Sequence, residues 1–248
     1  MKVLITGSTG RLGTEVAKLF PDALTPRRTE LDASDRGSIY TYVAKEKPDV
    51  IIHLAALTGI PPCETNKELA WRTNVEGTMH LINACYENNK GCYFLYMSTP
   101  CVMDGKRGMY VETDIPNPEN FYGLTKLLGE VVVLNHALKN RTVVRGNFVP
   151  KMKWPHPGAF TDRYGTYLFA PDLAKAIQEV VDARYTGMLH LVGQELLSMH
   201  QLAMLCPDSQ DVKQMSYAEY LKNGGYRLTQ NMSLDTIHKE WKRFRISK

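Results

Sequence analysis

A glycine-rich turn near the N-terminus constrains the fold more than any other feature of this 248-residue sequence. The segment VLITGSTGRLG, residues 3–13, spaces Gly7, Gly10 and Gly13 three apart between a short β-branched run and a helical pattern. In a strand–turn–helix unit the first glycine makes the tight turn and the second lets the backbone approach a pyrophosphate. The third lets the helix pack closely on the strand. The spacing GxxGxxG at this position therefore predicts nucleotide binding.

Strands and helices alternate along the first 150 residues. Strands that alternate with helices of this length indicate βαβ units and a parallel sheet. Continuous apolar runs such as DVIIHLAA and CYFLYM are typical of strands buried on both faces. We predict a Rossmann-type α/β fold with a doubly wound parallel sheet. The strands are expected at residues 3–6, 23–25, 49–57, 92–98 and 142–149, and the helices at 12–20, 38–45 (with Ser38 as N-cap), 67–87 and 122–138.

The residues that follow the second predicted strand bear on the choice of cofactor. NAD-selective sites usually carry an acid about 20 residues after the glycine turn, where it bonds the ribose 2′-OH. Here the strand ends in ALTPRR, so Arg27 and Arg28 occupy that position. Guanidinium groups bind a 2′-phosphate well, and Arg11 could reach it too. The sequence therefore predicts NADPH rather than NADH.

The pattern changes after Pro150. Residues 151–163 contain two prolines and a glycine with no clear period, so we expect a loop there. Further helices are expected at residues 171–184, 198–205, 217–222 and 234–244, and a strand at 188–192. We predict an NADP-binding Rossmann domain at residues 1–150. A smaller substrate-binding region at residues 151–248 follows, with some of its elements packing back on the first domain.

Composition excludes several classes of protein. A net charge of +4 is too mild to imply a nucleic-acid partner. No apolar run approaches the roughly 18–20 residues of a membrane helix, and no signal-peptide core follows Lys2. The five cysteines are odd in number and lack CxxC spacing, and the histidines show no metal-ligand spacing. We expect no metal, no membrane partner and a reducing cytoplasmic setting.

Tyr122 and Lys126 form a YxxxK pair on a predicted helix, where positions i and i+4 share one face. Ser98 and Thr99 end an earlier predicted strand, at the edge where α/β folds bind ligands. Reduction of a ketone by hydride needs a proton for the developing alkoxide. A tyrosine can donate it, and a neighbouring lysine lowers the tyrosine pKa from about 10. The set predicts a ketone reductase, with a surface pair on a helix as the structural alternative.

With these motifs, the chain resembles the extended short-chain dehydrogenase/reductase family, and within it the dTDP-4-dehydrorhamnose reductase branch. Matching segments span nearly the whole chain; they lie at residues 3–13, 30–35, 47–58, 74–81, 97–105, 110–130, 168–177, 187–193 and 233–238. MSTPCVMDG at 97–105 and LFAPDLAKAI at 168–177 are more specific to this branch than the other motifs. The resemblance implies NADPH-dependent reduction of the 4-keto group of a nucleotide-linked 6-deoxysugar.

The resemblance also assigns roles to single residues. It implies that Thr99 supplies the catalytic hydroxyl, Tyr122 the proton and Lys126 its partner, with Tyr122 and Lys126 also contacting the cofactor. Ser98, Thr99 and Phe148 would meet the substrate. The other implied cofactor-binding residues lie in the glycine turn, near the adenine, beside the ribose and phosphates, and on the long helix: Gly7, Thr9, Gly10, Arg11, Leu12, Gly13, Arg27, Arg28, Asp32, Ala33, Ala55, Ala56, Thr58 and Asn74.

The chain departs from the family pattern on the sugar side. Pro100 and Cys101 follow the Ser-Thr pair, where the family often has Asp-Tyr, and residues 151–163 are altered. Two alternatives therefore stay open: a UDP- or GDP-sugar reductase or epimerase, and a non-catalytic NADP-binding regulatory subunit like that of methionine adenosyltransferase. The intact Thr99, Tyr122 and Lys126 favour an enzyme. The resemblance implies a nucleotide-sugar substrate and allows a homodimer.

Overall fold

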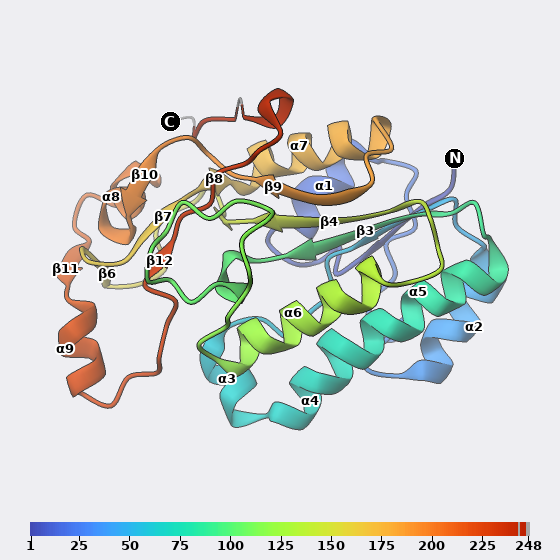
Figure 1. Ribbon diagram of the computed structural model, residues 1–248, viewed down its shortest axis with the longest axis horizontal. Helices are drawn as coiled ribbons and strands as arrows, with labels where there is room; N and C mark the ends of the chain where they lie inside the picture. Colours follow the sequence, from blue (N-terminus) through green and yellow to red (C-terminus); the bar gives the residue numbers. More distant parts are fainter. Residues whose placement is uncertain (243, 247–248) are drawn as a thin grey trace.

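A five-stranded parallel sheet forms the centre of the molecule, and helices cover both of its faces (Figure 1). The computed structural model describes residues 1–242 and 244–246. The strand order is β1-β2-β3-β4-β9, with bounds Val3–Thr6, Val50–His53, Tyr93–Ser98, Arg141–Gly146 and Gly187–Leu191. All four pairings are parallel. The predicted Rossmann-type sheet is confirmed. The strand expected at 23–25 is reduced to a single bridge between Leu24 and Leu4.

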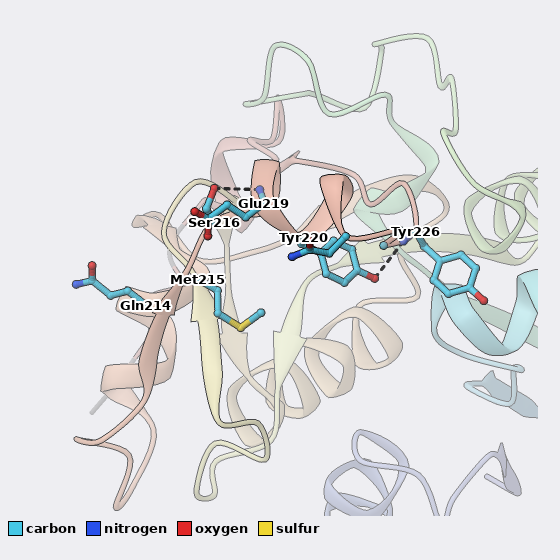
Figure 2. A pocket seen from close by; sticks show the side chains of 9 residues that line it. Gln214, Met215, Ser216, Glu219, Tyr220 and Tyr226 are labelled. Atoms are coloured by element: carbon cyan, nitrogen blue, oxygen red, sulfur yellow. Dashed lines mark hydrogen bonds between the residues drawn. The ribbon is translucent and has the colours of Figure 1, made fainter.

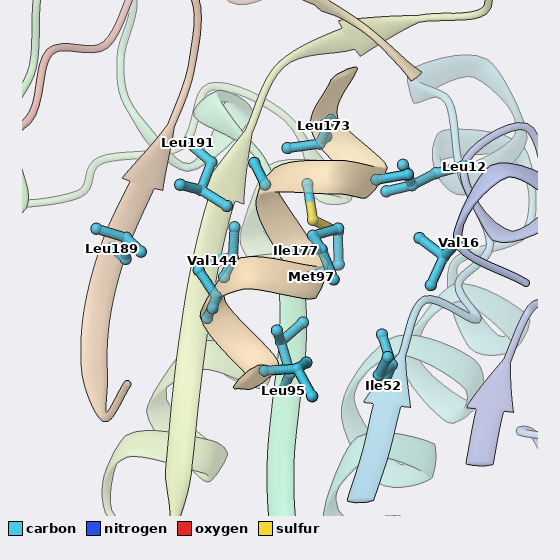
Figure 3. Packing of buried hydrophobic residues seen from close by; sticks show 14 of the residues in the cluster. Leu12, Val16, Ile52, Leu95, Met97, Val144, Leu173, Ile177, Leu189 and Leu191 are labelled. Carbon is cyan, nitrogen blue, oxygen red and sulfur yellow. The ribbon is translucent and has the colours of Figure 1, made fainter. Parts of the chain in front are cut away.

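The two faces of the sheet bury two separate cores. Alternate strand residues such as Ile52, Leu95 and Val144 point toward α1 and α7, and Figure 3 shows how these side chains interlock. Their neighbours, Ile51 and Phe94 among them, point toward α2, α5 and α6. These helices span Gly13–Leu19 (α1), Ala170–Asp182 (α7), Arg36–Glu46 (α2), Gly77–Asn88 (α5) and Phe121–Leu134 (α6). Burial on both faces explains why the strands are apolar throughout.

Several predicted helix ends shift once the capping contacts are known. The side chain of Asp35, rather than Ser38, caps α2, and it accepts a hydrogen bond from the Ser38 N–H. The strand expected at 49–57 ends at His53, because the next residues turn toward the site. The helix expected at 67–87 consists of α4 (Lys67–Trp71), a π-helical turn (Arg72–Glu76) and α5. Such π-helical turns are frequent at functional sites.

A smaller lobe lies beyond the carboxyl ends of the central strands (Figure 1). Short strands in three small sheets, with α8 (Met199–Leu205) and α9 (Tyr217–Lys222), build it. The strands are β5 (Phe148–Val149) with β8 (Leu168–Phe169), β6 (Gly158–Phe160) with β11 (Lys213–Met215), and β7 (Tyr164–Thr166) between β10 (Leu196–Ser198) and β12 (Asn231–Met232). The predicted loop at 151–163 thus contains one strand, β6. The boundary near residue 150 stays a prediction, and α7 and β9 join the first-domain core.

The prediction of a helix at 234–244 is wrong for the residues that the structure describes there. Leu234 forms an isolated bridge with Tyr110, and only a single 3₁₀ turn follows, at Lys239–Trp241. Residue 243 lies outside the described residues. Leu234 is buried and Asp235 pairs with Lys242, so tertiary contacts override the local helical pattern. Across the described chain, no helix combines the length and hydrophobicity needed to cross a bilayer.

Candidate active site

The glycine turn between β1 and α1 is packed tightly on one side and open on the other. Gly7 has a φ of +71°, and a Cβ added there would lie 2.7 Å from the Ala55 nitrogen. A Cβ on Gly13 would lie 2.1 Å from the Gly7 carbonyl oxygen. At Gly10, by contrast, the only neighbour within reach is the Gly7 oxygen, at 3.2 Å. Packing requires glycine at two positions, and the open side of Gly10 leaves the backbone room to approach a phosphate group.

The loop at the adenosine end carries cations and one acid. Arg28 Nε donates to Asp32 Oδ2 at 3.1 Å, so one predicted 2′-phosphate ligand already has a partner. Burial acts to raise the pKa of Asp32, but hydrogen bonds from Ser34 and the contact with Arg28 hold that pKa below its usual value. Arg11 and Arg27 are exposed and form no ion pair within the described residues. They are the cations still available to a phosphate.

Asn74 holds the turn that follows β2. Its Oδ1 accepts from Leu57 N–H at 2.8 Å, and its Nδ2 donates to the Leu57 carbonyl at 3.0 Å and to Thr125 Oγ1 at 3.0 Å. The side chain is 1% exposed and lies in the π-helical turn. These three hydrogen bonds tie the turn to the π-helical segment and to α6, so one role of Asn74 is to place the neighbouring turn residues. The predicted cofactor contacts Ala55, Ala56 and Thr58 lie in that turn, between half-buried and exposed.

A buried hydrogen-bond chain supports the same turn from below. The Ala55 N–H donates to Thr6 Oγ1 at 3.2 Å, and Thr6 lies 2.7 Å from His53 Nδ1. His53 Nε2 lies 3.1 Å from Thr78 Oγ1, which donates to the Asn74 carbonyl at 2.8 Å. These directions require a neutral His53 with its proton on Nε2. Burial lowers the pKa of His53 to about 3, so the ring is neutral at pH 7, and both of its nitrogens have partners inside the protein.

Thr99 and Tyr122 come together where β3 ends and α6 begins. Asn120 caps α6 by accepting from the Gly123 N–H at 2.9 Å. A Cβ on Gly123 would lie 2.2 Å from the Cys101 carbonyl oxygen, so the helix start lies directly on the turn after Thr99. Burial raises the pKa of Tyr122 above its usual value, while a hydrogen bond with the Thr99 side chain opposes that rise. The pKa of Tyr122 thus lies above its usual value, not below it as the YxxxK pair predicts, because burial outweighs the neighbouring lysine, and the phenol is protonated at neutral pH.

Lys126 lies one helical turn after Tyr122 and is 4% exposed. Its Nζ lies 4.0 Å from the centroid of the Tyr96 ring, and no hydrogen bond of this ammonium is found among the described residues. Burial lowers the pKa of Lys126 to about 7, although the negative charge of Glu130 acts to raise that pKa. A buried ammonium with unused donors is suited to binding a polar ligand.

The predicted substrate contacts Ser98 and Phe148 lie elsewhere. Ser98 Oγ donates to Glu130 Oε1 at 2.5 Å inside the protein. Phe148, in β5, packs against the core beneath α7. The structure therefore brings together Thr99, Tyr122 and Lys126, but it does not direct the Ser98 hydroxyl to this group.

Some polar residues around the site are not indicated by the sequence motifs. Asn120 Nδ2 is buried without a hydrogen-bond partner in the described part of the chain, so it can donate to a ligand. Its place directly before the YxxxK helix was the available signal. Glu130 and Arg145 form a buried ion pair behind Lys126. The described residues contain no group of three or more metal-ligating side chains.

A hollow of about 490 Å³ lies on the small lobe beside α9 (Figure 2). Figure 2 shows Met215 and Tyr220 along its wall and the Tyr220 hydroxyl bonded to the Tyr226 backbone. Neither Thr99 nor Lys126 lines it. The hollow is thus a feature of the small lobe, outside the group formed by Thr99, Tyr122 and Lys126.

Comparison with known proteins gives consistent matches. The profile of the family described as RmlD substrate binding domain matches residues 1–152. The chain is 30% identical to dTDP-4-dehydrorhamnose reductase of Aggregatibacter actinomycetemcomitans, over 82% of this chain and 77% of that one. It is 33% identical to methionine adenosyltransferase 2 subunit beta of Bos taurus, over 84% and 72%. The crystal structure of a hypothetical dTDP-4-dehydrorhamnose reductase from Sulfolobus tokodaii superposes with a TM-score of 0.81 at 30% identity, covering 95% and 92%.

Proposed function

Because the chain belongs to the RmlD substrate binding domain family, we propose that it is an NADPH-dependent reductase of the 4-keto group of a dTDP-linked 6-deoxysugar. The observation that carries the proposal is that Thr99 follows the end of β3 where α6 begins, and that Tyr122 and the buried Lys126 lie one turn apart on that helix. Hydride reduction of a ketone needs a proton donor for the developing alkoxide, and Tyr122 can supply that proton beside a hydroxyl and an ammonium group.

The chemistry divides between cofactor and protein. NADPH supplies the hydride when it is bound. Tyr122 donates its phenolic proton to the carbonyl oxygen of the sugar, and Thr99 holds that oxygen by a hydrogen bond. The raised pKa of Tyr122 keeps the donor protonated at neutral pH. Lys126 stabilises the tyrosinate left after transfer and donates hydrogen bonds to the ribose next to the nicotinamide.

The residues present fit a dinucleotide. The open side of Gly10 admits the pyrophosphate, since among the described residues only the Gly7 oxygen lies within 4 Å of the position that a Cβ would take. Arg11 and Arg27 are the proposed ligands of the 2′-phosphate, with Arg28 shared between that phosphate and Asp32. Ala33, Ala55, Ala56 and Thr58 are proposed to line the adenosine and ribose sides. Thr9 and Leu12 complete the turn.

Two variants of this function keep the same machinery. A UDP- or GDP-sugar reductase or epimerase would differ only in pocket groups, and Pro100 and Cys101 alter that side.

Asn120, with its unpaired buried Nδ2, is the proposed donor to the sugar. NADPH oxidation measured across dTDP-, UDP- and GDP-linked 4-keto sugars tests the proposal. Turnover with the dTDP-linked sugar alone supports the proposed substrate. Turnover only with a UDP- or GDP-linked sugar would show that the enzyme is a reductase of that sugar instead.

A non-catalytic subunit is the second candidate. The 33% identity to methionine adenosyltransferase 2 subunit beta of Bos taurus favours it, as does the changed Pro100–Cys101 segment. Such a subunit would bind NADPH tightly and reduce none of the keto sugars. Co-purification with a methionine adenosyltransferase, together with an inactive but NADPH-bound chain, would select this function.

A homodimer and a cytoplasmic location complete the proposal. Four apolar side chains on the helices of one sheet face are exposed: Trp71, Met79, Leu124 and Val131. A second copy of the chain would cover them. The five cysteines are free and buried, which supports a reducing compartment. Light scattering of the purified protein tests the dimer, and a monomer at micromolar concentration would contradict it.

A further inference from the structure

A buried ion pair lies directly behind the group formed by Thr99, Tyr122 and Lys126. Arg145 Nε donates to Glu130 Oε1 at 2.9 Å, and Arg145 Nη2 donates to Glu130 Oε2 at 2.7 Å. Both side chains are 2% exposed. The pair joins α6 to β4 by two parallel hydrogen bonds, the geometry that fixes both position and orientation.

Further hydrogen bonds use the remaining capacity of the pair. Ser98 Oγ donates to Glu130 Oε1 at 2.5 Å. Arg145 Nη1 lies 3.3 Å from His190 Nε2, and His190 Nδ1 lies 2.8 Å from the Asp235 carbonyl. Since that carbonyl can only accept, the proton of His190 is on Nδ1 and its Nε2 accepts from Arg145. The network thus connects β3, α6, β4 and β9.

Stability alone is a weak reason for such a pair. Two apolar side chains of similar volume often give equal or greater stability than a buried ion pair, because both charges must leave water. The position of this pair suggests another reason. Glu130 follows Lys126 by one helical turn, and Ser98 immediately precedes Thr99. The network therefore includes Ser98, which is next to Thr99 in the chain, and Glu130, which lies one helical turn from Lys126.

The groups around the Lys126 ammonium show why Glu130 matters. Tyr96 faces it from β3, His53 from β2 and Cys63 from the short helix α3 (Ile60–Thr65). Burial lowers the pKa of His53 to about 3 and raises that of Cys63 to about 11, so both are neutral at pH 7. Among the described residues that act on Lys126, Glu130 is the one that supplies a negative charge.

We propose that Glu130, held by Arg145 and Ser98, is a positioning residue for the reaction. It supplies the counter-charge of the Lys126 ammonium and fixes the end of β3 that carries Thr99. The role in turnover rests on the proposed reductase function, whereas the charge relation between Glu130 and Lys126 does not.

The direct test is titration of Lys126 in the cofactor-free protein. Lysine labelled with ¹³C at the ε-carbon reports the ammonium by NMR, and a Lys126→Arg variant assigns the signal. Glu130→Gln should move the Lys126 midpoint down by about one pH unit or more, as expected for a unit charge one turn away at an effective dielectric near 20. Arg145→Gln should move it up, because Glu130 is no longer neutralised. A purely structural role would not give opposite shifts.

Two further variants guard the test against misfolding. The double variant Glu130→Gln/Arg145→Gln removes both charges of the pair, so neither glutamate nor arginine is left without its partner, and it should still lower the Lys126 midpoint. Glu112→Gln is the matched control. The Glu112 carboxylate accepts from His190 N–H at 2.8 Å in the same region, but among the described residues it bonds to Thr236 and Ile237 rather than to Glu130, Arg145 or Lys126. It should leave the midpoint unchanged. An unchanged midpoint in a folded double variant, or an equal shift in Glu112→Gln, overturns the proposal.

The reductase assay separates this proposal from the proposed function. In an active enzyme, the alkaline limb of kcat should move to lower pH in Glu130→Gln by the same amount as the NMR midpoint. A wild-type protein that shows the Lys126 shift but reduces no keto sugar would refute the reductase function and leave the charge relation intact. An active wild type whose pH profile and midpoint are the same in Glu130→Gln would refute the positioning role.

Discussion

Substitution of Gly10 by alanine should abolish tight cofactor binding while leaving the fold intact. The added Cβ meets one protein atom, the Gly7 carbonyl oxygen at 3.2 Å, so the turn needs to yield by only a few tenths of an ångström. The backbone at Gly10 is not in the left-handed region, so alanine suits it. We expect the free energy of unfolding to change by no more than about 1 kcal/mol.

The cost to NADPH binding should be much larger. The new methyl group occupies the open side of the turn, where the pyrophosphate is proposed to approach. Loss of one charge-assisted hydrogen bond to phosphate costs about 1.5–3 kcal/mol, or roughly 10–150-fold in Kd. Titration with NADPH, followed by protein fluorescence, measures this loss, and thermal unfolding measures stability on the same samples.

Gly13→Ala is the matched control for this prediction. Its Cβ would lie 2.1 Å from the Gly7 oxygen and 2.8 Å from Ser8 Cα, so the backbone itself must move. Such overpacking costs at least about 1–3 kcal/mol of stability. Wild-type NADPH affinity in Gly10→Ala, or equal destabilisation by the two variants, would refute the assignment of the open side to the cofactor.

Three further predictions follow from the site. Tyr122→Phe should lower kcat by about 10²–10⁴-fold with little change in NADPH affinity, because general acid catalysis is worth about that much; near-normal turnover would mean another proton donor. Arg27→Ala should weaken NADPH about 10-fold or more and leave NADH unchanged, as measured by parallel fluorescence titrations; equal losses for both cofactors would contradict a contact with the 2′-phosphate. The free energy of unfolding should fall as pH drops from about 6.5 toward 3, by up to about 1.4 kcal/mol per pH unit, since the unfolded chain protonates His53 and the folded one does not. Urea denaturation between about pH 7 and 5 tests this, and His53→Gln should remove that part of the slope.

The parts of the fold that depend on local pattern were predictable. Apolar runs located the central strands, and the spacing of Tyr122 and Lys126 correctly indicated one face of a helix. The glycine spacing likewise indicated the turn whose tight contacts the structure shows at Gly7 and Gly13. In each case the signal lies within a few residues, where periodicity and turn chemistry act.

The parts that depend on distant partners were not predictable. Arg145 and His190 reach Glu130 from separate strands, and no spacing in the sequence relates them. Leu234 begins a stretch with a helical pattern, but it forms an isolated bridge with Tyr110 instead. Asp35 and Ser38 are both suitable cap residues near the start of α2, and only the geometry selects Asp35 over Ser38. Tertiary contacts decide all of these cases.

The most direct test of the account is product formation from a dTDP-linked 4-keto-6-deoxysugar. The purified chain is mixed with NADPH and the keto sugar, and NADPH loss and product mass are followed together, with Tyr122→Phe as the control. We expect one NADPH to be consumed for each sugar that gains two hydrogens, and almost no product from Tyr122→Phe. NADPH bound tightly, with no product from dTDP-, UDP- or GDP-linked keto sugars, would contradict it.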